Sequence, residues 1–215
     1  MSFSKTNNSI IALSILCLLL YSTCLSALEK PGLNLTPDEW TRLKKGELIL
    51  RIEEFENEKG GKGARTKTFS LVNATPDEVW KVLYEPDKDF KWAPNIVTSE
   101  ITNRGENFLD IHYVLKTPFK LFQFHIHRVY HKDILLIKSN LLENEKNDLD
   151  IVDGLYALYP IEGGKKTIIY YSLYVVASPK IPTVIMDFFT KQGCKGWMEN
   201  LKKRVESGGT WERPH

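Results

Sequence analysis

The sequence has 215 residues, of which 42% are hydrophobic and 26% are charged. This composition indicates a folded globular protein, because a disordered chain contains fewer apolar residues and carries more net charge. With 29 Lys and Arg against 27 Asp and Glu, the formal net charge is only +2. The chain therefore lacks the concentrated basic excess of a nucleic-acid-binding protein, and no nucleic-acid partner is expected.

Residues 1–26 have the pattern of a secretory signal peptide. Lys5 precedes an apolar run over residues 10–21, and small residues follow over residues 22–27. This order is typical of a cleaved leader, and the run is shorter than the roughly 20 apolar residues that cross a bilayer. We therefore expect an exported protein that is periplasmic or secreted after cleavage. An uncleaved N-terminal membrane anchor and a lipoprotein modified at Cys24 are the alternatives.

Residues 27–63 are predicted to form a short helix and a first strand. Thr36 is the expected N-cap of the helix, Pro37 its first residue, and Glu39 completes a capping box. A strand is predicted over residues 47–56. The glycine-rich turn that follows leads to a returning strand over residues 66–72, so the two strands are expected to pair as a hairpin.

Residues 64–209 are predicted to form the main domain. The capping pattern recurs at Thr75-Pro76-Asp77-Glu78 and predicts a second helix that ends near Leu83. Residues 89–94 are interpreted as a short aromatic connector. From Ile96 to Ala177 apolar and polar residues alternate, which indicates antiparallel strands with one apolar face and short connections. The expected strands begin at Ile96, Phe108, Phe122, Ile134, Asp150 and Thr167.

The C-terminal part of the chain predicts one long amphipathic helix. Apolar residues from Ile181 to Val205 recur with a period close to 3.6 residues. Gly208-Gly209 is a strong helix stop, and residues 210–215 are a tail. A sheet with one apolar face and a helix with one apolar stripe are expected to pack against each other.

Residues 69–83, with the sequence FSLVNATPDEVWKVL, resemble the opening of the SRPBCC superfamily of START-like and polyketide-cyclase-like proteins. Residues 154–167 resemble the paired late strands of that superfamily, and Ile181-Pro182 resembles the start of its last helix. The resemblance implies an α+β helix-grip fold, in which a curved antiparallel sheet wraps around the long C-terminal helix. It also implies an apolar cavity, which in known members holds lipids, sterols, quinones, polyketides or plant metabolites, in many cases without catalysis.

The ligand-binding residues predicted on this basis are mostly aromatic. The walls of the cavity are assigned to Tyr113, Phe122, Phe124, Tyr156 and Tyr171, its roof to Phe188, Phe189 and Trp197, and its entrance to Trp92. Arg128 continues the apolar face of its strand, and its cation could hold a phosphate or carboxylate. The alternative for Arg128 is a strand-end position that reaches water, and for each aromatic residue it is a filled core.

Other candidate chemistry is weaker. His125, His127 and His131 share one strand face, and this spacing can bind zinc, but they lie opposite the apolar residues, so an exposed polar face is favoured. Asp110 and His112 also share a face and could act as acid and base, but they have no evident third partner. Cys194 lacks a paired histidine. We therefore predict no catalytic set, no metal site and no cofactor.

The favoured hypothesis is an exported, monomeric and non-catalytic protein that binds a lipid or another hydrophobic molecule and makes transient membrane contact. One alternative is a cyclase, dehydratase or hydrolase that uses the same cavity, with Arg128 or a tyrosine as the acid–base group. The other alternative is a protein-interaction module with a filled core.

Overall fold

The computed structural model describes residues 28–56, 62–176 and 188–214. The predicted signal peptide and the glycine-rich turn after Glu56 lie largely or wholly outside these residues, as does the predicted start of the C-terminal helix. The chain divides into two compact units, residues 1–30 and residues 31–215. The second unit contains all the helices and strands of the described part.

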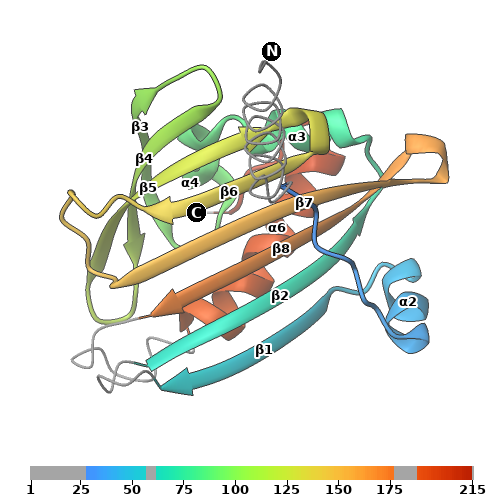
Figure 1. Cartoon of the computed structure of the whole chain (residues 1–215), viewed down its shortest axis with the longest axis horizontal. Coiled ribbons are helices and arrows are strands. Elements are labelled where there is room, and N and C mark those ends of the chain that lie inside the picture. Colours follow the sequence, from blue (N-terminus) through green and yellow to red (C-terminus); the bar gives the residue numbers. More distant parts are fainter. Residues whose placement is uncertain (1–27, 57–61, 177–187, 215) are drawn as a thin grey trace, which may run out of the picture. The chain divides into compact units, whose positions relative to one another are not determined.

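Eight antiparallel strands form one sheet in the order β1-β2-β8-β7-β6-β5-β4-β3 (Figure 1). Strands β3 to β8 pair consecutively as a meander, and the hairpin of β1 and β2 joins this meander at β8. The predicted hairpin and meander are thus confirmed. The strands are β1 (Ile49–Glu56), β2 (Lys62–Val72), β3 (Ile96–Arg104), β4 (Phe108–Lys116), β5 (Leu121–His131), β6 (Leu136–Leu141), β7 (Ile151–Ile161) and β8 (Lys166–Val176).

The two faces of the sheet differ as the alternation predicts. On β4, Leu109, Ile111 and Tyr113 are at most 2% exposed, whereas Asp110 and His112 lie on the opposite face and are only partly buried. Neighbouring side chains on a strand point to opposite faces. The apolar face is therefore the one that the helices cover.

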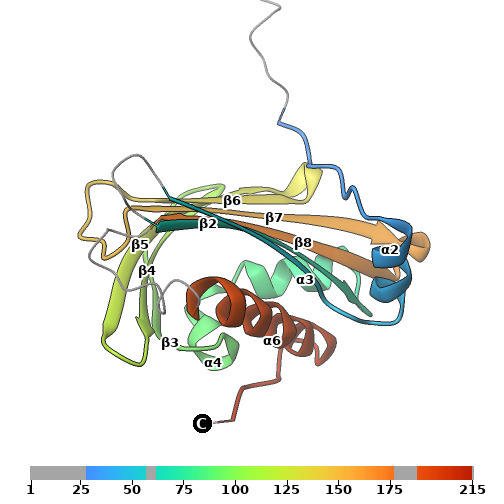
Figure 2. The same ribbon diagram turned by 90° about the horizontal axis from the view of Figure 1, so that it is seen from below.

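Figure 2 shows the helices α3 (Pro76–Leu83), α4 (Asp89–Trp92) and α6 (Cys194–Glu206) on one face of the sheet. The remaining helix, α2 (Pro37–Lys44), contacts β1 and β2 at their end and buries Leu43. Both predicted capping boxes are present, at Thr36 in front of α2 and at Thr75 in front of α3. None of the helices in the described ranges is both long enough and apolar enough to span a bilayer.

The C-terminal helix is less regular than the sequence predicts. Its described part begins with a π-helical turn, η5 (Phe188–Gly193), before the α-helical geometry of α6. On α6, Cys194, Met198, Leu201 and Val205 are at most 2% exposed. Their spacing of three or four residues forms the apolar stripe that packs on the sheet.

The segment over residues 89–94 is not the simple connector that we predicted. It contains α4, which follows a short 3-10 helix, η2 (Pro86–Lys88). The backbone N–H of Ala93 closes this turn by donating to the carbonyl of Asp89 at 2.7 Å. The turn carries Asp89 and Trp92 into the interior, where both are at most 2% exposed.

Candidate functional site

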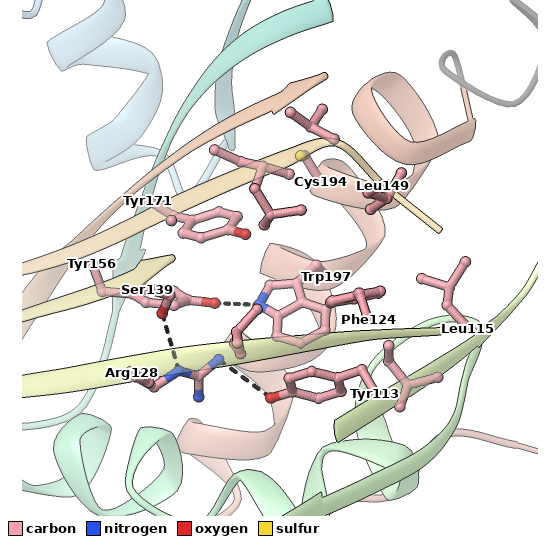
Figure 3. Close-up of a pocket in the computed structure, with 16 residues that line it drawn as sticks. Tyr113, Leu115, Phe124, Arg128, Ser139, Leu149, Tyr156, Tyr171, Cys194 and Trp197 are labelled. Carbon is pink, nitrogen blue, oxygen red and sulfur yellow. Dashed lines mark hydrogen bonds between the residues drawn. The ribbon is translucent and has the colours of Figure 1, made fainter. Parts of the chain in front are cut away.

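A cavity of about 120 Å³ lies between the sheet and α6 (Figure 3). Strands β4 to β8 supply most of its wall, and Cys194 and Trp197 of α6 close it. The lining is mostly apolar. Its polar groups are the guanidinium of Arg128, the hydroxyls of Ser139 and three tyrosines, and the thiol of Cys194.

Aromatic rings form a connected group around this cavity. The rings of Tyr156 and Tyr171 stack with their centroids 4.4 Å apart, and those of Tyr113 and Phe124 stack at 5.5 Å. Trp197 donates a hydrogen bond from Nε1 to the hydroxyl of Tyr156 at 2.5 Å. These contacts fix the orientation of the rings, so the wall presents flat apolar surfaces to a ligand.

The hydroxyl of Tyr171 points into the cavity in Figure 3. No described residue forms a hydrogen bond to this hydroxyl, whereas the hydroxyls of Tyr113 and Tyr156 are both bonded to protein groups. Tyr171 therefore offers a free donor and acceptor to a ligand within an otherwise apolar wall.

Arg128 is buried at the polar end of the cavity and is only 5% exposed. Its Nε donates to the hydroxyl of Ser139 at 3.3 Å, and its Nη2 donates to the hydroxyl of Tyr113 at 3.2 Å. The alternative of a strand-end arginine that reaches water is wrong, because β5 continues for three residues to His131. Arg128 therefore lies within the strand, facing the interior.

Asp89 lies behind Tyr113 at this polar end and does not itself line the cavity; the sequence analysis missed it. The hydroxyl of Tyr113 donates to Oδ2 of Asp89 at 2.6 Å, so Tyr113 bridges Asp89 and Arg128. Burial raises the pKa of Asp89 to about 7, although the charge of Arg128 and the hydrogen bond from Tyr113 act in the opposite direction. The only signal in the sequence was one carboxylate at the start of an aromatic segment.

Six of the ten predicted binding residues line the cavity. They are Tyr113, Phe124, Arg128, Tyr156, Tyr171 and Trp197. Phe188 and Phe189 belong to η5, but their side chains lie outside the described part of the chain. Whether the six bind a ligand stays a prediction.

Two predicted residues lie elsewhere. Trp92 is not at an entrance: it is 1% exposed and packs edge-on against Trp197, with the ring centroids 5.0 Å apart. Phe122 is fully buried and packs in an apolar cluster with Leu149 and Val152. Those two residues line the cavity, but Phe122 itself does not. It lies on the same strand face as Phe124, two residues nearer the start of β5.

The structure also adds lining residues that the sequence analysis did not assign. They are mostly aliphatic side chains from neighbouring strands: Ile96, Leu115, Ile126, Leu149, Val152, Leu173 and Val175, together with Ser139, Gly154 and Cys194. Alternation placed most of these on the apolar face, but an aliphatic residue in a wall has the same pattern as one in a filled core.

The thiol of Cys194 is not a nucleophile in this setting. Burial raises its pKa to about 11, and its Sγ lies 3.3 Å from the hydroxyl of Thr66. A protonated, enclosed thiol is unreactive. Among the described residues, no three His, Cys, Asp or Glu side chains are gathered in an arrangement that would hold a metal ion.

Solved structures with the same architecture include lipid-transfer proteins. A STAR-related lipid transfer protein fragment from Xanthomonas axonopodis has 15% identity and a TM-score of 0.57, covering 72% of this chain and 98% of its own. Human StAR-related lipid transfer protein 5 has 14% identity and a TM-score of 0.56, covering 93% and 96%.

A biosynthetic protein shares the architecture as well. The di-domain aromatase/cyclase BexL, from the BE-7585A biosynthetic pathway, has 17% identity and a TM-score of 0.52, covering 66% of this chain and 46% of its own. No family model matches the sequence, and no curated protein matches it. At these identities the likeness concerns the fold, and the chain has the helix-grip fold of START-type proteins.

Proposed function

We propose that this protein binds a hydrophobic small molecule in the cavity between the sheet and α6, without catalysing a reaction. The observation that carries the proposal is an apolar cavity with one polar end, formed by Arg128 and Tyr113. Ligand sites commonly combine apolar walls with a few polar groups that set orientation. The solved lipid-transfer proteins that share this fold add support.

The volume of the cavity defines what part of a ligand fits inside. Pockets for drug-sized molecules enclose roughly 300–1,000 Å³, and an apolar cavity of about 150 Å³ is sufficient for benzene. A cavity of about 120 Å³ therefore encloses one ring or a short length of chain. A longer lipid would have to displace part of the lining or extend out of the cavity.

The polar groups define which end of the ligand enters. The free hydroxyl of Tyr171 and the cation of Arg128 would both accommodate an oxygen acceptor, such as a carbonyl, hydroxyl or carboxylate. The proposed ligand is thus an apolar molecule with an oxygen function at its enclosed end.

Gly154 allows this proposal to be tested without removing any contact. It lines the cavity on β7, and a Cβ built there would lie 3.5 Å from the Cβ of Ser139, which is an ordinary contact. Gly154→Leu should fill the cavity, while Gly154→Ala should leave most of it open. Each protein is purified from its native host, and its bound molecules are extracted for mass spectrometry.

We expect one apolar molecule per chain in the wild type and in Gly154→Ala, and none in a folded Gly154→Leu. An empty wild type that also ignores apolar fluorescent probes would contradict binding and direct attention to protein partners. A fully loaded Gly154→Leu would place the ligand elsewhere.

A cyclase, dehydratase or hydrolase activity is the second candidate. It is favoured by the contact between Asp89 and Tyr113, because a carboxyl with a pKa of about 7 can exchange protons at neutral pH. The molecule recovered from the wild type decides between the two. If incubation with the protein converts it into a product and Asp89→Asn abolishes that conversion, the protein is an enzyme.

We also propose that the protein is exported and collects its ligand at a membrane. Phe119, in the turn between β4 and β5, is 64% exposed, and Leu121, the first residue of β5, is 55% exposed. The turn closely follows the cavity residue Leu115 in the chain. Phe119→Asp should reduce sedimentation with phospholipid vesicles, whereas Val97→Asp, at another exposed apolar residue, should not. Equal sedimentation of both variants would argue against this contact.

A further inference from the structure

The outer face of the sheet, opposite the cavity, carries a block of four side chains on β4 and β5. Asp110 and His112 come from β4, and His125 and His127 come from β5. The strand register pairs His112 with His125 and Asp110 with His127. Because residues two apart on a strand share a face, all four side chains lie on the same surface.

One ring nitrogen on each of His112 and His125 lacks a hydrogen-bond partner. The two rings stack with their centroids 4.4 Å apart and their planes at 13°. Nε2 of His112 and Nδ1 of His125 are both buried and unpartnered, and they are two of only three such side-chain atoms in the described ranges. Buried polar atoms are almost always satisfied in native proteins, and an orphaned one often marks the place of an ion or water.

The second pair, Asp110 and His127, is arranged differently. Nδ1 of His127 lies 2.6 Å from Oδ1 of Asp110, and Oδ2 of Asp110 accepts a hydrogen bond from Asn103 at 2.9 Å. A carboxylate bound to one ring nitrogen holds the proton there and leaves the other nitrogen with a free lone pair. Metal-binding histidines are commonly oriented by a carboxylate in this way.

We propose that this block binds one divalent transition-metal ion, of the zinc and copper class, through His112, His125 and His127. Asp110 acts as a positioning residue that orients His127. Imidazole nitrogens suit zinc, copper and nickel, whereas calcium and magnesium prefer oxygen ligands. The metal site is separate from the ligand cavity, because it uses the opposite face of the same two strands.

The distances between the strands allow three ligands to reach one ion. Directly opposite residues of an antiparallel pair have their Cβ atoms about 4.5–5.5 Å apart, and diagonal neighbours are about 7–8 Å apart. His112 and His125 are directly opposite, and His112 and His127 are diagonal. In the described structure these side chains are not arranged to hold a metal ion. Metal binding therefore requires the imidazole rings to rotate and the stack of His112 and His125 to separate.

The experiment uses tag-free protein from its host, stripped with EDTA and titrated with zinc chloride by calorimetry. We expect one zinc ion per chain in the wild type. His112→Gln and His125→Gln should each weaken binding at least tenfold, and Asp110→Asn should weaken it about tenfold as a second-sphere change. The matched control is His131→Gln, on the same strand face but outside the block, which should bind zinc as the wild type does.

Copper(II) provides a second measurement that a purely structural role would not affect. The electron paramagnetic resonance spectrum of the bound ion should show nitrogen coupling that His125→Gln reduces. No stoichiometric zinc uptake by the wild type, or equal affinity in the wild type and His125→Gln, would overturn the proposal. Loading with the cavity ligand should be unchanged in every variant, which separates this test from that of the proposed function.

Discussion

The replacement of Asp89 by asparagine tests the polar end of the cavity through the pH dependence of stability. Burial raises the pKa of Asp89 from its ordinary value of 3.8 to about 7 in the folded protein. The folded state therefore holds this proton more tightly than the unfolded chain does. The stabilisation from this proton is complete below about pH 4 and is lost as the pH rises toward about 7.

The two pKa values set the size of the effect. Each unit of difference between the folded and unfolded pKa values corresponds to about 1.4 kcal/mol. The full change in the free energy of unfolding is therefore about 4 kcal/mol. Between about pH 5 and pH 8 the wild type should lose about 3 kcal/mol relative to Asp89→Asn. The amide of asparagine cannot titrate, and its oxygen can still accept the hydrogen bond from Tyr113.

Urea unfolding of both proteins across this pH range measures the difference. Asp133→Asn, at an exposed carboxylate just after β5, is the control and should follow the wild-type curve. Parallel curves for the wild type and Asp89→Asn would refute the reasoning, because they would mean that Asp89 binds its proton equally in both states.

Three further changes test the packing around the site. Arg128→Met removes the cation that opposes the raised pKa of Asp89, so it should raise that pKa further. The free energy of unfolding should fall by about 3–5 kcal/mol near pH 8 and by less near pH 5. Urea unfolding at the two pH values checks this. Leu201→Ala, at a fully buried position on α6, should lower the free energy of unfolding by about 2–5 kcal/mol, and a loss below about 1 kcal/mol would contradict tight docking of α6. Thr75→Ala removes the N-cap of α3 and should cost about 1 kcal/mol, measured by the midpoint of thermal unfolding.

The elements with strong local signals could be predicted from the sequence. Each capping box spans only four residues, one beginning at Thr36 and the other at Thr75, and both helices begin where predicted. The alternation along β4 and β5 placed Tyr113 and Phe124 on the face that holds the cavity. Patterns of this kind depend on near neighbours in the chain, and therefore survive without knowledge of the fold.

The failures concern residues whose place depends on distant contacts. Trp92 and Asp89 lie in a segment with no clear period, and their burial depends on α6 and β4 packing against them. Phe122 and Phe124 have the same pattern, and only the extent of the cavity separates them. The burial of Arg128 could be predicted only by knowing where β5 ends, because a strand that stopped earlier would have left this side chain near water.

The pairing of β2 with β8 has a consequence for how the chain is made. These strands meet at Thr66 and Leu173, which are 107 residues apart in the sequence. Contacts over such separations form slowly, because a long loop must close before any pairing energy is gained. The hairpin of β1 and β2 therefore has no further strand to pair with until β8, near the end of the chain, has been synthesised. For a chain that we propose is exported, this delay would leave β2 without its second neighbour while the growing polypeptide is threaded through a translocation pore.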